Sequence, residues 1–134
     1  MKNTKSLKKA FDFRKTLNYG KFSKGKYVAV YALKRKKTEN CEENLFGICV
    51  SKKHGNSVTR NKLKRWAREA YTSYENSLKK GYLVIVLYKK DIREDYDNGK
   101  ISYELISKDI EKCFEEIGLK EGKDTKWKRF LLVW

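Results

Sequence analysis

The run GYLVIVLYK, residues 81–89, limits the possible folds of this chain more than any other segment. Its apolar residues are nearly continuous, whereas a strand with one face in water alternates polar and apolar residues. A run of this length and composition is typical of a central β-strand that is buried on both faces. We therefore expect a small sheet built around this strand, with helices packed over it.

The chain before this run is predicted to supply one helix and two or three strands. Residues 5–18 read as the helix, since Ala10, Phe13 and Leu17 recur at helical spacing. The segments KYVAVYALK and LFGICVS have the composition of strands, and we expect them to pair antiparallel through an exposed hairpin loop. The two strands cover residues 26–34 and 45–51, and the loop between them covers residues 34–44.

Two further helices are expected, one on each side of the apolar run. The first covers about residues 56–74, with Asn56 or Ser57 as its N-cap. The second covers about residues 102–117, where apolar residues again recur at helical spacing. The intervening segment DIREDYDNGK is rich in turn residues and is predicted to be a loop.

The resulting order, α-β-β-β-α-β-α, is that of an α+β protein with a two-layer sandwich of helices on a small sheet. At 134 residues and 40% apolar content, the chain suits one compact domain with a modest core. The whole chain, 1–134, is taken as this domain. Its core is expected within residues 6–117, and residues 118–134 are treated as a C-terminal extension.

The net charge of +16 points to a polyanionic partner, because a compact protein with this charge repels itself. The charge is concentrated in residues 1–70, where 20 Lys and Arg stand against five Asp and Glu, a net +15. Residues 71–134 contribute only +1. The first half of the chain is therefore expected to meet the partner, and the second half to complete the fold.

Nucleic acid is favoured over a membrane surface as that partner. No run approaches the ~20 apolar residues of a transmembrane helix, and the N-terminus lacks the apolar segment of a signal peptide. Cys41, Cys49 and Cys113 show no C-x-x-C spacing, and His54 alone cannot complete a zinc site with them. Free thiols in a reducing cytoplasm are the expected state, with no metal bound by the protein itself.

The segment KKHGNSVTRNKLKRWAREAY, residues 52–71, is predicted to be a phosphate-binding helix with its leading turn. Five polar side chains share its outer face: Arg60, Asn61, Lys64, Arg65 and Arg68. A solvated face usually mixes charges, because like charges four residues apart repel, and arginine forks match phosphate geometry. A plain solvated face remains the alternative. A helix-turn-helix DNA reader is not expected, since a strand precedes this helix where that motif needs another helix.

Aromatic residues are predicted to complete the binding surface. Phe13 in the first helix, with Tyr27 and Tyr31 in the first strand, is expected to form an exposed platform, because aromatics beside a basic groove hold single-stranded nucleic acid. Burial of the same aromatics in the core is the alternative. No catalytic constellation accompanies them, since His54 has no partner nearby in the sequence.

The segment FGICVSKKHGNSVTRNKLKRWAREAY, residues 46–71, resembles the signature of the bacterial ribonuclease P protein family. In that signature a strand and a Lys-Lys-x-Gly turn lead into an Arg-Asn-Arg helix. The upstream segments LKKAFDFRKTLNYGK and KYVAVYAL also fit the family's first helix and second strand. The resemblance covers roughly residues 6–117.

This resemblance implies a subunit of ribonuclease P, a cytoplasmic ribonucleoprotein whose catalytic RNA removes the 5′ leader of precursor tRNA. It implies that Mg²⁺ is bound mainly by the RNA subunit and the substrate, and that the protein alone is not catalytic. It also implies a one-to-one partnership with the catalytic RNA. Finally, it implies a left-handed β-α-β crossover, against the usual right-handed rule.

The resemblance also assigns two binding surfaces on this chain. The surface for the catalytic RNA takes in the basic helix and the turn before it: Lys52, Lys53, Arg60, Asn61, Lys62, Lys64, Arg65 and Arg68. The surface for the single-stranded 5′ leader lies between the first helix and the sheet: Phe13, Leu17, Tyr27, Tyr31 and Val58. This chain departs from the family pattern in two of these residues, since Lys62 replaces an arginine and Leu17 stands where an aromatic residue is frequent.

Two other functions stay open at this point. One is a general RNA-binding or ribosome-associated protein without a role in tRNA cleavage. The other is a protein-only nuclease that uses His54 with nearby acidic residues.

Overall fold

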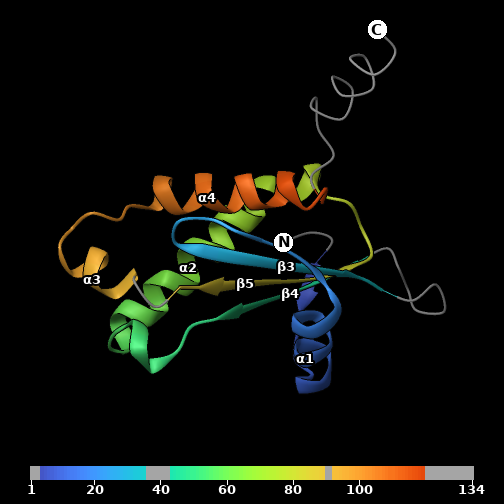
Figure 1. Cartoon of the computed structure of the whole chain (residues 1–134), viewed down its shortest axis with the longest axis horizontal. Helices are drawn as coiled ribbons and strands as arrows, with labels where there is room; N and C mark the ends of the chain where they lie inside the picture. The colour runs from blue at the N-terminus through green and yellow to red at the C-terminus, as the bar shows by residue number, and fades with distance from the viewer. Residues whose placement is uncertain (1–3, 36–42, 90–91, 120–134) are drawn as a thin grey trace, which may run out of the picture.

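The structure is a computed structural model of the chain that describes residues 4–35, 43–89 and 92–119. Figure 1 shows a mixed sheet with helices on both sides. The elements in chain order are β1 Thr4–Ser6, α1 Ala10–Tyr19, β2 Lys21–Lys24, β3 Val28–Lys34, β4 Asn44–Cys49, the 3₁₀ turn η1 Lys52–His54, α2 Ser57–Tyr74, η2 Glu75–Ser77, β5 Tyr82–Tyr88, α3 Ile92–Asp97 and α4 Tyr103–Glu116.

Strand β5 is the central strand of the sheet, as its apolar sequence predicts. The strand order is β1-β4-β5-β3-β2, and β5 runs parallel to β4 and antiparallel to β3. Its successive residues enter two different cores: Val84 and Val86 join the core under α2 and α4, whereas Leu83 and Ile85 join the smaller core on the α1 face. Thus α2 and α4 form one layer on the sheet, and α1 crosses the opposite face (Figure 1).

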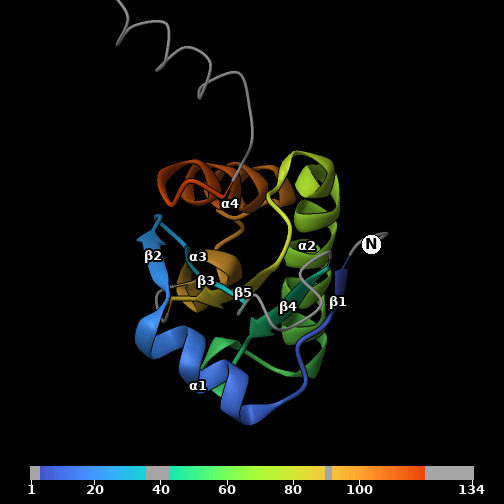
Figure 2. The ribbon, with the colours of Figure 1, turned by 90° about the vertical axis from the view of Figure 1, so that its right-hand side faces the viewer.

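The β4–α2–β5 connection has the left-handed sense that the family resemblance implies. In Figure 2 both parallel strands run away from the viewer, and β5 lies to the left of β4. Helix α2 returns toward the viewer on the α4 side of the sheet, which is the upper side in this view. The chain therefore runs away from the viewer along β4, comes back toward the viewer above the sheet along α2, and enters β5 to the left of β4. This is a left-handed crossover, the uncommon hand for β-α-β units.

Helix α2 begins where the sequence predicts, and Asn56 is its N-cap. The side-chain oxygen of Asn56 accepts a hydrogen bond from the Thr59 N–H at 3.0 Å, which satisfies one free donor of the first turn. On the core side, the buried Tyr88 hydroxyl donates to the Leu63 carbonyl at 2.7 Å. This bond ties the middle of α2 to the end of β5, so the outer face of the helix has a fixed orientation.

The predicted pairing of the strands in residues 26–34 and 45–51 is wrong. Strand β5 lies between them, so that β3 pairs with β2 and β5, and β4 pairs with β1 and β5. The physical reason is that β5 is the most apolar strand and is buried best between two neighbours. The middle of the expected hairpin loop, residues 36–42, lies outside the described residues.

The predicted element order is confirmed, and the structure adds β1 before it and α3 within it. The expected first helix begins only at Ala10, because Thr4–Ser6 instead pairs with β4 in parallel. Helix α3 forms in the segment that was predicted to be a loop. Both additions are short and polar in sequence, so neither has a periodicity that the sequence could reveal.

Candidate nucleic-acid interface

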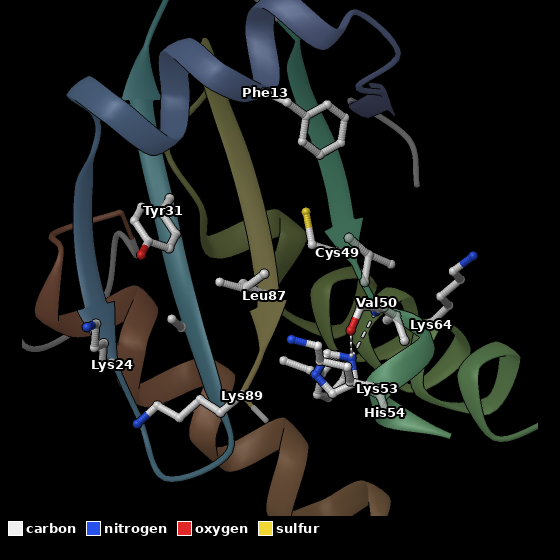
Figure 3. A pocket seen from close by; sticks show the side chains of 14 residues that line it. Phe13, Lys24, Tyr31, Cys49, Val50, Lys53, His54, Lys64, Leu87 and Lys89 are labelled. Carbon is white, nitrogen blue, oxygen red and sulfur yellow. Dashed lines mark hydrogen bonds between the residues drawn. The ribbon is translucent and has the colours of Figure 1, made fainter. Parts of the chain in front are cut away.

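A cleft of about 910 Å³ opens on the α1 face of the sheet, at the C-terminal ends of β4 and β5. Figure 3 shows Phe13 reaching down from α1 at one end and Tyr31 standing on β3. The opposite end is formed by the turn that leads into α2, with Lys53 and His54. Segments far apart in the sequence thus build one continuous depression, which we call the leader cleft after the ligand that the family resemblance predicts for it.

Phe13 lies flat against the sheet because Gly47 leaves room for its ring. A Cβ atom on Gly47 would come within 2.5 Å of the Phe13 Cζ atom, closer than real Cβ contacts allow. The ring is therefore half-buried against β4 and keeps its other face toward the cleft. Tyr31 is likewise half-buried, so both rings remain available to a nucleobase.

The rim of the leader cleft is positively charged. Four lysines line it, from β2, η1, α2 and the end of β5: Lys24, Lys53, Lys64 and Lys89. No acidic side chain of the described residues lines it with them. Aromatic walls with a basic rim are the combination that binds a single-stranded polyanion, through stacking on the bases and attraction to the phosphates.

His54 is a structural residue of the turn that closes this cleft. It is only 4% exposed, and its Nδ1 accepts a hydrogen bond from the Ser51 N–H at 2.9 Å. Burial lowers the pKa of the His54 imidazole, against hydrogen bonds to the backbone of Tyr88 and Lys89 that raise it. The ring thus fixes the turn that carries Lys52 and Lys53.

The outer face of α2 is the basic surface that the sequence predicts. Leu63, Trp66, Ala67 and Ala70 are buried on the inner face. The opposite face presents four exposed or half-exposed basic side chains and one amide, which we call the basic arc: Arg60, Asn61, Lys64, Arg65 and Arg68. Glu69 partly offsets the charge of this arc through an ion pair with Arg65 at 3.8 Å.

Lys62 lies apart from the basic arc. Its ammonium group stands over the rings of Trp66 and Tyr96, 5.3 and 5.9 Å from their centroids. These cation–π contacts join α2 to α3 and keep the charge at the edge of the helix.

The predicted leader-binding residues do not all meet in the cleft. Phe13 and Tyr31 line it, but Leu17 and Val58 do not, although Val58 is 76% exposed at the start of α2. The expected exposed platform is wrong for Tyr27, which is 7% exposed and packs in the core under α2 and α4. Strand β3 begins only at Val28, so the alternation that places Tyr31 on the α1 face does not extend back to Tyr27.

Phe22 is a further aromatic residue of this surface, and the sequence pattern does not reveal it. It lies opposite Tyr31 in the β2–β3 pairing, and the two rings stack with centroids 5.7 Å apart. Phe22 is 58% exposed, which is unusual for so large an apolar side chain. Its signal in the sequence is weak, because the four-residue strand KFSK has too few residues to show alternation.

The described helices include none that is long and apolar enough to cross a membrane. In the same part of the chain, no three His, Cys, Asp or Glu side chains are grouped so that they could hold a metal ion. Cys49 and Cys113 are free thiols, and Cys41 lies outside the described residues.

The fold and the site together define a basic α+β protein with an aromatic cleft beside a positively charged helix. Comparisons with known proteins extend this description. The family model of ribonuclease P matches residues 1–118. The ribonuclease P protein component of Clostridioides difficile is 40% identical over 85 residues, which are 63% of this chain and 71% of that protein.

Two more comparisons cover almost the whole length of the relatives. The ribonuclease P protein component of Bacillus cereus is 29% identical over 123 residues, 92% of this chain and 99% of that protein. The structure of the Staphylococcus aureus RNase P protein has the same fold, with a TM-score of 0.71 at 24% identity over 88% of this chain and 97% of that one. This chain belongs to the ribonuclease P protein family, whose members take part in tRNA processing within a ribonucleoprotein.

Proposed function

We propose that this chain is the ribonuclease P subunit that holds the catalytic RNA and the 5′ leader of precursor tRNA on adjacent surfaces. The observation that carries the proposal is the position of Lys53 and Lys64. Both belong to the basic turn and helix, and both also line the leader cleft opposite Phe13 and Tyr31. A catalytic RNA docked on the basic arc would therefore meet a leader that lies in the cleft.

The residues of this chain would bind and orient the RNAs, while the RNA subunit with Mg²⁺ cleaves the phosphodiester bond. The basic arc offers arginine forks for phosphates, and the cleft offers aromatic faces for unpaired bases. Holding a substrate in a reactive geometry is itself a large contribution to rate.

Under the same proposal, each chain binds one catalytic RNA and one precursor tRNA, and the protein is located in the cytoplasm. A single basic arc and a single leader cleft on the described residues fit one catalytic RNA and one precursor tRNA per chain. Free thiols at Cys49 and Cys113 fit a reducing compartment.

Reconstitution at low Mg²⁺ tests this function. The protein is added to transcribed ribonuclease P RNA and precursor tRNA, and release of the 5′ leader is followed on a gel. We expect cleavage to increase with the wild-type chain and much less with Arg60, Lys64 and Arg68 all changed to Ala.

Three exposed lysines of the α3–α4 part of the molecule, Lys100, Lys108 and Lys112, changed to Ala together, serve as the control for lost charge. No increase with the wild-type chain would contradict the proposal and leave a general RNA-binding protein as the better description. Cleavage without the RNA subunit would instead indicate a protein nuclease.

A further inference from the structure

A second groove, which the leader cleft does not include, lies on the same face of the sheet on the other side of α1. It has a volume of about 850 Å³ and is formed by β1, the first turns of α1 and the ends of β3, β4 and β5. Leu45 and Leu83 form its apolar floor. Six basic residues line it, and we call it the lysine groove: Lys5, Lys8, Lys9, Lys15, Lys34 and Arg35.

Internal contacts neutralise only part of this charge. Glu43 pairs with Lys5 at 3.4 Å, and its backbone oxygen accepts a hydrogen bond from Arg35 at 3.0 Å. Asp12 is the one acidic residue among the described residues that line the groove. The other four lysines have no ion pair within the described part of the chain, so the groove keeps a strong positive potential.

The residues that line the groove also indicate which part of a nucleic acid it could bind. Among the described residues it contains no aromatic side chain, in contrast to the leader cleft. Without a ring to stack on a base, binding would depend on phosphates alone. The matching ligand is a phosphodiester backbone bound without regard to its sequence.

The position of the groove indicates which RNA supplies that backbone. Leu45 and Leu83 precede Cys49 and Leu87 by four residues in the parallel strands β4 and β5, so the two depressions are separated by about 13 Å along the strands. The leader cleft ends at α2 on one side and at α1 on the other. A strand that enters beside Lys64 and passes Phe13 is directed toward the lysine groove.

We propose that the lysine groove binds the phosphates of upstream leader nucleotides, beyond those held in the leader cleft. This inference rests on the proposed function, because it extends the path of the same leader. Its consequence is that affinity for precursor tRNA should continue to rise as the leader lengthens past the first cleft. The additional affinity should be salt-dependent and independent of the leader sequence.

The test uses the complete ribonucleoprotein and a set of precursor tRNAs whose single-stranded leaders increase stepwise in length. Lys8, Lys9 and Lys34, all exposed, are changed together to Gln, and Lys100, Lys108 and Lys112, exposed at and before α4, are changed to Gln as the matched control. With long leaders we expect about a tenfold loss of affinity and a decrease of about 2 in the slope of log K against log salt, for three lost single-strand phosphate contacts. With the shortest leaders the variant should bind like the control.

Two results would overturn the inference. Equal loss for short and long leaders, or weaker binding of the RNA subunit itself, would assign the groove to the catalytic RNA. Behaviour identical to the control at every leader length would remove it as a binding site. Failure of the proposed function is distinguishable from both, because it would already show as no stimulation of cleavage by the wild-type chain.

Discussion

At the scale of single residues, the site depends on side chains whose own surroundings leave them little freedom. Phe13 is positioned by the absence of a side chain at Gly47, and the cleft mouth is positioned by a buried histidine. Both Phe13 and His54 are thus held in position before any nucleic acid is present. A preorganised site of this kind spends little binding energy on ordering its own side chains.

Substitution of Gly47 by Ala tests the fit between the strand and Phe13. The new methyl group would overlap the ring, so we expect the free energy of unfolding to fall by about 1–3 kcal/mol. In a Phe13→Ala background the methyl group has room, and the same change should cost almost nothing. Urea denaturation of the two single variants and the double variant measures this coupling. Additive costs would contradict the contact.

The pH dependence of stability tests the role of His54. Its Nδ1 accepts a hydrogen bond from Ser51 N–H, which a protonated Nδ1 cannot do, and burial lowers its pKa. The unfolded chain then binds the proton more readily than the folded one. Its contribution to stability is therefore present above the unfolded pKa of about 6.5 and is lost as the pH falls through the lower folded value.

His54→Gln keeps an acceptor oxygen but removes the titration. Since His54 is the only histidine of the chain, this variant should lose much of the slope of unfolding free energy between about pH 7 and 5. Denaturation at a series of pH values gives that slope. An unchanged slope would show that His54 is not the titrating group.

At the scale of elements, the turn between β2 and β3 is held by a helix far away in the sequence. The carboxylate of Asp109 on α4 accepts hydrogen bonds from three successive backbone N–H groups, those of Lys26, Tyr27 and Val28, at 2.9–3.0 Å. Gly25 is required beside them, because any Cβ atom there would overlap the carboxylate. This contact fixes the hairpin that carries Lys24 and Tyr31 into the leader cleft.

Asp109→Ala should therefore destabilise the protein by about 2–3 kcal/mol, since it leaves partly buried donors without their charged acceptor. Amide hydrogen exchange should become faster in β2 and the start of β3 before it does in β5. The neighbouring exposed residue gives the control, Lys108→Ala, which should change neither quantity. Uniformly faster exchange across the sheet would contradict a local role for the carboxylate.

The long elements were predictable from the sequence, and the reasons are physical. The uniform apolarity of β5 determines its central place, and the two-sided pattern of α2 determines which face is basic. Strand β1 was not predictable, because three polar residues become a strand only through pairing with β4 and the contact between Thr4 and Tyr71 hydroxyls. The burial of Tyr27 depends on where β3 begins, which alternation alone does not determine.

At the scale of the whole molecule, the charge is divided unevenly between the two halves of the chain. The basic first half of the chain builds α1, the edge strands and α2, which surround the leader cleft and the lysine groove. The nearly neutral second half supplies β5 and α4, which cover the core. Helix α2 takes part in both: its inner face packs in the core beside α4, and its basic outer face belongs to the proposed surface for nucleic acid.

The central claim is that two neighbouring surfaces hold two different RNAs, and the ratio of two affinities tests it most directly. The complete ribonucleoprotein is titrated with precursor tRNA and with mature tRNA, which lacks the leader, using the wild-type chain, Phe13→Ala, and the variant with Arg60, Arg65 and Arg68 changed to Ala, none of which lines the leader cleft. We expect Phe13→Ala to lower the preference for precursor tRNA by about 1–3 kcal/mol without weakening RNA-subunit binding. The arc variant should weaken RNA-subunit binding and reduce its salt dependence. An unchanged preference in Phe13→Ala, or the same defects in both variants, would contradict the two-surface account.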